Sequence, residues 1–282
     1  MKSISDAMKG LNNTRMGSTS EICYEHERKS NGVIQTLEIM KVSHDGEVFC
    51  PMCERARTTK ELSDEESNKI KRALSRRQYN VFHTQNVLTD IGLLDASFTT
   101  YETTEKEEID NKERATKAFT RYKANETFNT WFTGVPGVGK SHLAMSILRN
   151  LNETGLQDKS CLFVSIDEML LRIRGSFDNK ESRYTESYFA ELLSSVDFLV
   201  LDDLGAETGG TGTKKQATDF TLRVLYAIAN GRQNKSTIIT TNLTSSALVR
   251  MYDPKLVSRL GKDMFRIEFK NTVDKRLKNI DF

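Results

Sequence analysis

Residues 131–151 read WFTGVPGVGKSHLAMSILRNL, and they indicate the fold class of the second half of the chain. The apolar residues at its start are typical of a short buried strand. The segment 134–141 that follows matches the pattern G-x-x-x-x-G-K-[ST]. Apolar side chains then recur at helical spacing, at Leu143, Ile147, Leu148 and Leu151. A strand, a glycine-rich loop and a helix in this order predict a phosphate-binding loop within an α/β domain.

The residue types of this loop suit a nucleoside triphosphate. Glycine allows backbone conformations and a close approach that a Cβ would block, so successive N–H groups can surround the β-phosphate. We expect the helix 140–152 to begin under the phosphates, where its dipole favours negative charge. Lys140 would then reach the β- and γ-phosphates, and the Ser141 hydroxyl would bind Mg²⁺. The predicted nucleotide-binding residues of the loop are Gly134, Val135, Pro136, Gly137, Val138, Gly139, Lys140, Ser141 and His142.

Short apolar runs recur through the second half of the chain, with helical segments between them. The runs are 130–133, 161–166, 198–201, 237–240 and 264–269. Such alternation predicts a five-stranded parallel sheet with helices on both faces.

Polar residues follow two of these runs. Asp202 and Asp203 come directly after the run 198–201. We expect Asp202 to hold Mg²⁺ through its water shell and Asp203 to orient the attacking water. The alternative is a pair of strand-end acids that cap the next helix. Asn242 follows the run 237–240 and is expected to bind the attacking water or the γ-phosphate, although an asparagine there is also a common turn residue.

These segments, taken in order with Leu256-Val-Ser-Arg259-Leu260, resemble an AAA+ ATPase over roughly residues 96–282. More narrowly, they are similar to the DnaC/DnaI helicase-loader group and its transposition relative IstB. The resemblance implies that Arg259 is a finger that reaches the nucleotide of the next subunit, rather than part of a surface salt bridge. It also implies a second sensor in the last helix, for which Arg276 is the best match and Lys275 the fallback.

The resemblance further implies a switch-like ATPase that assembles on single-stranded DNA. Many AAA+ proteins have glutamate where this chain has Asp203, so we expect slow turnover. Between residues 167 and 195, cations are interleaved with aromatic residues that suit phosphates and stacked bases. The candidate DNA contacts are Arg172, Arg174, Lys180 and Arg183. The alternative is a solvated helix pair whose aromatic residues pack inward.

Two pairs of metal-ligand residues occur near the N-terminus. They are Cys23-x-x-His26 and Cys50-x-x-Cys53, and the segment between them contains the hairpin dipeptide Asp45-Gly46. Three thiolates and one imidazole are typical of a closed, structural Zn²⁺ site in a zinc-ribbon-like domain. The alternatives are His44 in place of His26, or free thiols beside an incidental histidine.

Charge and hydropathy exclude several function classes. The chain has 41 lysine and arginine residues against 39 acids, a net charge of +2, which excludes function as a bulk polycation. No apolar run approaches the roughly 20 residues that span a bilayer, and the first 20 residues lack the core of a signal peptide. We therefore expect a soluble, cytoplasmic protein with no membrane partner.

We expect three parts. Residues 1–60 would be the zinc-binding domain, with residues 1–20 frayed, and 61–95 a basic linker helix that starts at the Ser63 capping box. Residues 96–282 would be the ATPase domain, with a flexible loop at 208–215. The resemblance implies that the zinc domain docks on the helicase. The basic helix is either part of that docking surface, a DNA contact or a solvated linker.

The resemblance thus implies an ATP-dependent loader of a hexameric, DnaB-type replicative helicase onto single-stranded DNA at replication initiation. ATP, Mg²⁺ and structural Zn²⁺ would be its cofactors, and self-assembly would pass through the ATP site. The rival interpretations are an IstB-like ATPase that regulates a transposase, and a nucleic-acid-binding adaptor with a vestigial nucleotide site.

Overall fold

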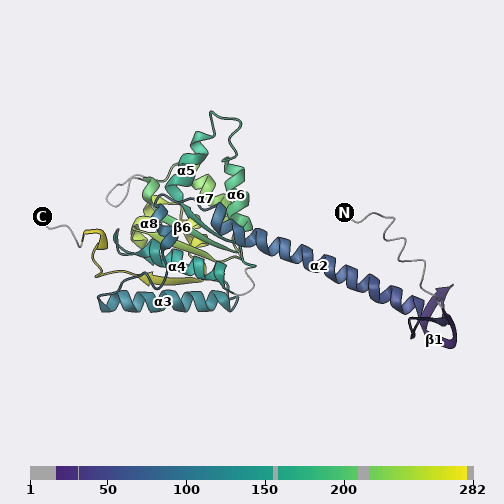
Figure 1. The fold of residues 1–282 in the computed structure, drawn as a ribbon. Helices are drawn as coiled ribbons and strands as arrows, with labels where there is room; N and C mark the ends of the chain where they lie inside the picture. The colour runs from purple at the N-terminus through teal and green to yellow at the C-terminus, as the bar shows by residue number, and fades with distance from the viewer. Residues whose placement is uncertain (1–16, 31, 155–157, 209–215, 278–282) are drawn as a thin grey trace. The chain divides into compact units, whose positions relative to one another are not determined.

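The computed structural model describes residues 17–30, 32–154, 158–208 and 216–277. The chain divides into two compact units, and the division falls between Arg72 and Ala73. Figure 1 labels the elements along the chain. The expectations for residues 1–16 and for the loop at 209–215 lie outside the described residues.

The first unit contains a three-stranded antiparallel sheet in the order β1-β2-β3. Its strands are β1 (Gly17–Ser30), β2 (Val33–His44) and β3 (Glu47–Phe49). Asp45 and Gly46 both have positive φ, at 52° and 85°, as a two-residue type I′ hairpin requires. The predicted hairpin is therefore confirmed.

Strand β1 corrects the expectation that residues 17–20 fray. Gly17 pairs with Ser43 and Ser18 pairs with Val42, so β2 supplies the hydrogen-bonding partners. Both faces of this strand are largely exposed, and a strand with two exposed faces needs no alternation of apolar and polar residues. For that reason the polar sequence gave no signal of a strand.

Helix α2 (Pro51–Thr84) runs without a break across the division between the units. The expected start at Ser63 is wrong, because the helix already begins at Pro51, where a proline costs no hydrogen bond. The cations of the expected basic linker lie on this helix and are exposed. They are Lys69, Lys71, Arg72, Arg76 and Arg77.

The second unit is built on the predicted parallel sheet, with strands in the order β5-β6-β7-β4-β8. Every neighbouring pair in this sheet is parallel. The strands coincide with the five predicted runs to within a few residues. They are β4 (Asn129–Thr133), β5 (Cys161–Ser165), β6 (Phe198–Leu204), β7 (Thr237–Thr241) and β8 (Met264–Glu268).

Helices cover both faces of this sheet, as the alternation predicted (Figure 1). Phe132 faces a core with residues of α3 and α4, while its neighbour Trp131 faces a second core with residues of α5, α6 and α7. Successive strand residues point to opposite faces, so each strand contributes to both cores. The helices are α3 (Lys106–Lys123), α4 (Lys140–Glu153), α5 (Ile166–Gly175), α6 (Glu186–Ser195), α7 (Asp219–Gly231), α8 (Ser245–Met251) and α9 (Pro254–Leu260).

Short 3₁₀ turns complete the unit at η2 (Ile91–Asp95), η3 (Ala206–Thr208) and η4 (Lys275–Leu277). Among the described helices, none combines the length and the apolar character that a membrane crossing demands. Strands β6, β7 and β4 are neighbours in the sheet, so their carboxyl ends lie side by side at one edge. In open α/β sheets this edge is where ligands bind.

Candidate functional site

A cavity of about 310 Å³ lies at the carboxyl ends of these strands, within the range of small-ligand sites. The loop after β4 forms its floor, while Asp203 comes from β6 and Asn242 from the residue after β7. The residues that line it are Leu93, Thr100, Tyr101, Glu102, Pro136, Gly137, Gly139, Lys140, Ser141, His142, Asp203, Asn242, Lys275 and Arg276.

Two glycines of the loop cannot carry a side chain. Gly139 has a φ of 91°, and a Cβ there would lie 2.5 Å from the Tyr101 ring. Gly137 has a φ of 76°, and a Cβ there would lie 1.7 Å from Oδ1 of Asp274. Alanine would therefore be strained at both positions and would also collide with a neighbouring segment.

Lys140 is the first residue of α4, and its side chain is buried in the pocket. Its Nζ donates to the carbonyl oxygen of Val135 and to Oδ1 of Asn242, both at 2.7 Å. Burial lowers the pKa of Lys140 to about 8, although the charges of Asp203 and Asp202 oppose this shift. The structure thus brings together the predicted loop lysine and the polar residue after β7.

The two acids lie at the end of β6, which continues one residue past them to Leu204. The pairing of β6 with β7 shifts register between Leu201 and Leu204, and Asp203 has a φ of 56° at this irregularity. Thr240 of β7 connects the acids. Its Oγ1 donates to Oδ1 of Asp202 at 2.7 Å and accepts from the backbone N–H of Asp203 at 2.9 Å.

Burial raises the pKa of Asp202 to about 7, and the neighbouring charge of Asp203 adds to the shift. Burial also raises the pKa of Asp203. A hydrogen bond with the Ser141 hydroxyl lowers the pKa of Asp202, which shows that this hydroxyl lies beside the carboxyl. Ser141 and Asp202 are oxygen ligands of the kind that Mg²⁺ prefers, so this pair of residues fits a Mg²⁺–nucleotide.

Both candidates for the second sensor reach the pocket. Lys275 and Arg276 line it from η4, which is one 3₁₀ turn, so the expected last helix is wrong for the described part of the C-terminal segment. Lys275 Nζ lies 3.3 Å from Oε1 of Glu108 and 4.2 Å from the centroid of the Tyr101 ring. The Lys275 charge thus already has protein partners.

Arg259 is not among the described residues that line the pocket. It lies in the last turn of α9 and is exposed, with its guanidinium carbon 5.3 Å from the centroid of the Tyr226 ring. The guanidinium is therefore accessible to another molecule.

The candidate DNA contacts lie on α5 and in the connection between α5 and α6. Arg172 pairs with Glu168 at 2.8 Å, and Arg174 lies over the Phe220 ring. Arg183 lies over the Tyr184 ring, and Lys180 is exposed in the connection. Among the interleaved aromatic residues, Tyr184 and Tyr188 pack partly against the core while Phe177 is 58% exposed. Part of the aromatic surface is therefore used for packing.

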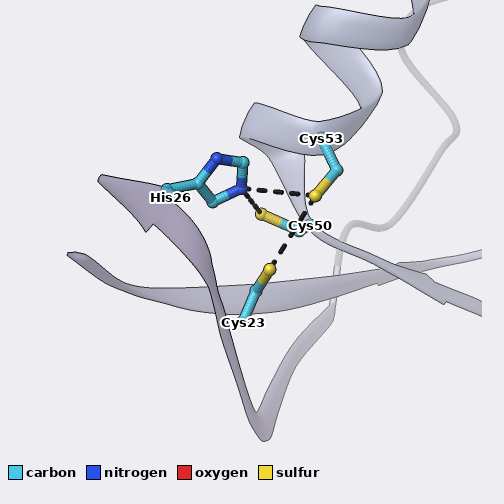
Figure 2. Close-up of side chains that lie close together, drawn as sticks. All are labelled: Cys23, His26, Cys50 and Cys53. Atoms are coloured by element: carbon cyan, nitrogen blue, oxygen red, sulfur yellow. Dashed lines mark hydrogen bonds between the residues drawn. The ribbon is translucent and has the colours of Figure 1, made fainter. Parts of the chain in front are cut away.

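The four predicted ligands of the first unit come together (Figure 2). Cys23 and His26 lie on β1, Cys50 directly precedes α2, and Cys53 lies in the first turn of α2. The pairing of β1 with β2 shifts by one residue between Cys23 and His26. This bulge places both side chains on one face, where three-residue spacing in a regular strand would separate them.

The ligand atoms of this cluster lie within 4.8 Å of one another. The Sγ atoms of Cys23 and Cys53 are 3.8 Å apart, and Nε2 of His26 lies 3.2 Å from Sγ of Cys50. Two thiolates at about 2.3 Å from a tetrahedral Zn²⁺ lie about 3.8 Å apart, so the donor set fits zinc. His44 is not in this group of described residues, and its Nδ1 lies 3.4 Å from Asp45.

Sequence reasoning missed the segment before α3. The Tyr101 hydroxyl donates to the carbonyl oxygen of Val138 at 3.2 Å. Nε2 of His142 lies 2.9 Å from the carbonyl oxygen of Ser97 and 3.2 Å from the Thr100 hydroxyl. Burial lowers the pKa of His142, which favours the neutral ring. No motif marks Ser97, Thr100 or Tyr101, because their role depends on how the chain folds back over the phosphate loop.

A family model for IstB-like ATP binding proteins matches residues 59–260, which is most of the chain. The chain belongs to this family. A stretch of 139 residues in this IstB-like protein is 34% identical to "Replicative helicase loader DnaC" of Buchnera aphidicola subsp. Acyrthosiphon pisum (strain APS), and covers 47% of this chain and 53% of the relative. The chain thus spans about half the length of this curated relative.

Two crystal structures share the fold of the IstB-like chain. The DnaC helicase loader has a TM-score of 0.52 and 22% identity, and the match covers 64% of this chain and all of that one. DnaI has a TM-score of 0.52 and 20% identity, over 66% of this chain and 96% of that one. The resemblance to the DnaC/DnaI group and the predicted AAA+ fold are confirmed.

Proposed function

We propose that this protein is an ATP-dependent loader, which places a hexameric DnaB-type replicative helicase on single-stranded DNA at replication initiation. The observation that carries the proposal is the convergence of Lys140, Asp203 and Asn242 on one pocket, in a chain similar to a replicative helicase loader. The contacts within this pocket speak against the rival interpretation of a vestigial nucleotide site.

The residues of the pocket suit binding and slow hydrolysis of ATP. Lys140 binds the β- and γ-phosphates, and exchanges its contacts with Val135 and Asn242 for phosphate oxygens. Ser141 and Asp202 hold Mg²⁺, which neutralises charge on the phosphates. Asp203 orients the attacking water and Asn242 supports the γ-phosphate. Aspartate is one methylene shorter than glutamate, so the water is held less well and turnover is slow.

Arg259 completes the site of a neighbouring subunit. Its exposure and its position outside its own pocket support a role between copies of the chain. An arginine finger supplied by a neighbour makes assembly depend on the nucleotide. ATP then acts as an assembly switch, and hydrolysis releases the loader.

The N-terminal residues supply the helicase contact in this proposal. Cys23, His26, Cys50 and Cys53 hold a structural Zn²⁺, which stabilises a unit that is too small to build a large core. Residues 1–60 dock on the helicase, 61–95 link the parts, and 96–282 form the ATPase. Candidate contacts to the DNA backbone are Arg172, Arg174, Lys180 and Arg183.

A loading assay tests this proposal. The full chain, a hexameric DnaB-type helicase and ATP are incubated with circular single-stranded DNA, and helicase bound to the circle is measured. We expect loading by the wild-type chain and none by Lys140→Ala, which loses the cation that grips the phosphates. Absence of any helicase complex with wild-type protein overturns the loader proposal. Capture of a transposase instead supports the IstB-like alternative.

A further inference from the structure

The segment 272–277 lies against the phosphate loop. The backbone N–H of Lys275 donates to the carbonyl oxygen of Gly137 at 3.1 Å. The Asp274 carboxylate fills the space where a Cβ of Gly137 would stand, and it accepts the backbone N–H of Arg276 at 2.9 Å. These contacts give the segment a defined path past the loop.

The Lys275 side chain is held by two buried groups and by one backbone carbonyl, because its Nζ also donates to the carbonyl oxygen of Glu102 at 2.5 Å. Its Nζ lies 3.3 Å from the Glu108 carboxylate, which is 1% exposed, and 4.2 Å from the centroid of the Tyr101 ring, which is 3% exposed. Glu108 is itself fixed at the start of α3, where it accepts the N–H of Thr104 at 2.6 Å. Tyr101 in turn contacts the phosphate loop through Val138.

Arg276 is placed differently from its neighbour. Its backbone is fixed by Asp274, but its guanidinium has no hydrogen-bond or ion-pair partner among the described residues. It lines the pocket together with Lys140 and Asp203. The two adjacent cations of this 3₁₀ turn therefore differ in their surroundings. Lys275 pairs with protein groups, whereas the Arg276 side chain is left to face the pocket.

We propose that Glu108, Tyr101 and Lys275 form a positioning clamp that holds the C-terminal segment on the phosphate loop and so fixes Arg276 at the γ-phosphate. This inference rests on the proposed function, which places ATP in the pocket. Lys275 and Glu108 are positioning residues, since neither needs to touch the nucleotide. Fixing the backbone beside Arg276 before ATP arrives reduces the ordering cost of binding. The clamp thereby helps the site to distinguish ATP from ADP.

The central variant is Lys275→Met, which keeps the length of the side chain and removes its charge. Affinities for Mg²⁺–ATP and Mg²⁺–ADP are measured on the full chain. We expect ATP binding to weaken about tenfold, as loss of one charge-assisted contact implies, while ADP binding changes little. Lys275→Arg keeps the charge and should restore most of the preference for ATP. Lys270→Met is the matched control, because Lys270 pairs with Glu268 and does not line the pocket.

Combination with Arg276→Ala separates a positioning role from a merely structural one. If the clamp acts through Arg276, Lys275→Met has no further effect on the ATP to ADP ratio in the Arg276→Ala background. The clamp is overturned if Lys275→Met weakens ATP and ADP binding equally. It is also overturned if Lys275→Met lowers the ATP to ADP ratio as much in the Arg276→Ala background as in the wild-type chain. Glu108→Gln, which keeps an acceptor for Thr104, should lower the ATP to ADP ratio in the same direction as Lys275→Met but by less, because Lys275 keeps its bond to the Glu102 carbonyl oxygen.

The single variant Arg276→Ala distinguishes failure of the sensor role of Arg276 from failure of the clamp. If it leaves the ATP to ADP ratio unchanged, the sensor role in the proposed function is wrong, and the clamp is overturned with it. If it lowers the ratio while Lys275→Met does not, the sensor stands and the clamp alone fails.

Discussion

At the scale of the residue, Thr240 organises the acidic side of the pocket. One hydroxyl donates to the Asp202 carboxyl and accepts the N–H of Asp203. Asp203 has positive φ, a conformation that is uncommon outside glycine and is sustained here by surrounding contacts. The position of both carboxyl groups therefore depends on a neighbouring strand.

Thr240→Val should lower kcat for ATP hydrolysis more than it lowers ATP affinity. Valine has nearly the same shape, but it removes one hydrogen bond from the buried Asp202 carboxyl and leaves the N–H of Asp203 without its partner, a cost of about 1–3 kcal/mol. Steady-state hydrolysis and nucleotide binding measure the two effects. Thr241→Val is the control, because its hydroxyl donates to the Leu204 carbonyl and touches neither acid. Equal losses of kcat in both variants would contradict the assignment.

Asp202 should make the nucleotide-free protein less stable as pH rises. Its pKa is about 7 in the folded chain and 3.8 as an ordinary carboxyl. Between these values the unfolded chain gives up a proton that the folded chain keeps, so rising pH favours unfolding. Above pH 7 the folded chain carries the full cost in stability of an ionised, buried carboxyl. Asp202→Asn removes it, so its melting temperature should exceed that of wild type at pH 8 and match it near pH 4. If Asp202→Asn melts below wild type at pH 8, ionisation of the buried Asp202 carboxyl does not cause the loss of stability.

At the scale of the element, the group formed by Cys23, His26, Cys50 and Cys53 lies where α2 begins. Cys50 directly precedes the helix and Cys53 lies in its first turn, so a bound metal would constrain both cysteines. The helix starts at Pro51, twelve positions before the Ser63 capping box. A capping box at Ser63 is a local signal for a helix start. Here the helix starts earlier, at the proline between the two cysteines.

Zinc removal should unfold the first unit and spare the second. Chelation removes the metal and Cys53→Ser removes one of its ligands, so each takes away binding free energy that stabilises the folded unit. Circular dichroism and ATP binding follow the two units separately, and metal analysis should find one zinc per wild-type chain. Cys161→Ala is the control, since this cysteine lies on β5 outside the cluster. Wild-type protein purified without zinc would refute the site.

The strands and the phosphate loop were predictable because their signals are local. A short apolar run predicts a strand whichever strands it pairs with. The G-x-x-x-x-G-K-[ST] pattern predicts the conformation of the phosphate loop from eight consecutive residues. Strand β1 and the role of Tyr101 were not predictable, because each depends on contacts across many residues. For Tyr101, the partner Val138 lies 37 positions away.

At the scale of the whole molecule, the site contains the means to bind ATP but not the arginine expected to complete it. Arg259 stands exposed on α9, outside the described lining of its own pocket. The N-terminus of that helix is capped by Asp253, which accepts the backbone N–H of Lys255. The arginine is therefore carried on a short, well-defined helix.

Arg259→Ala should keep ATP binding and lose ATP-dependent self-association. The variant leaves the pocket intact but removes the group that would contact a neighbour's nucleotide. Sedimentation velocity with and without ATP measures the effect. Arg250→Ala is the matched control, because Arg250 is an exposed arginine in the last turn of the adjacent α8. If Arg259→Ala sediments like wild type in ATP, the finger role is lost.

The raised pKa of the Asp202 carboxyl has a thermodynamic consequence for assembly. With a pKa of about 7 it is partly protonated near neutral pH, and a divalent cation that binds beside it would displace the hydrogen ion that remains. Each filled site then acidifies the solution slightly, and calorimetric heats should vary with the ionisation enthalpy of the buffer. Several subunits that fill together release several hydrogen ions, so mild alkalinity is expected to favour the multimer over separate chains.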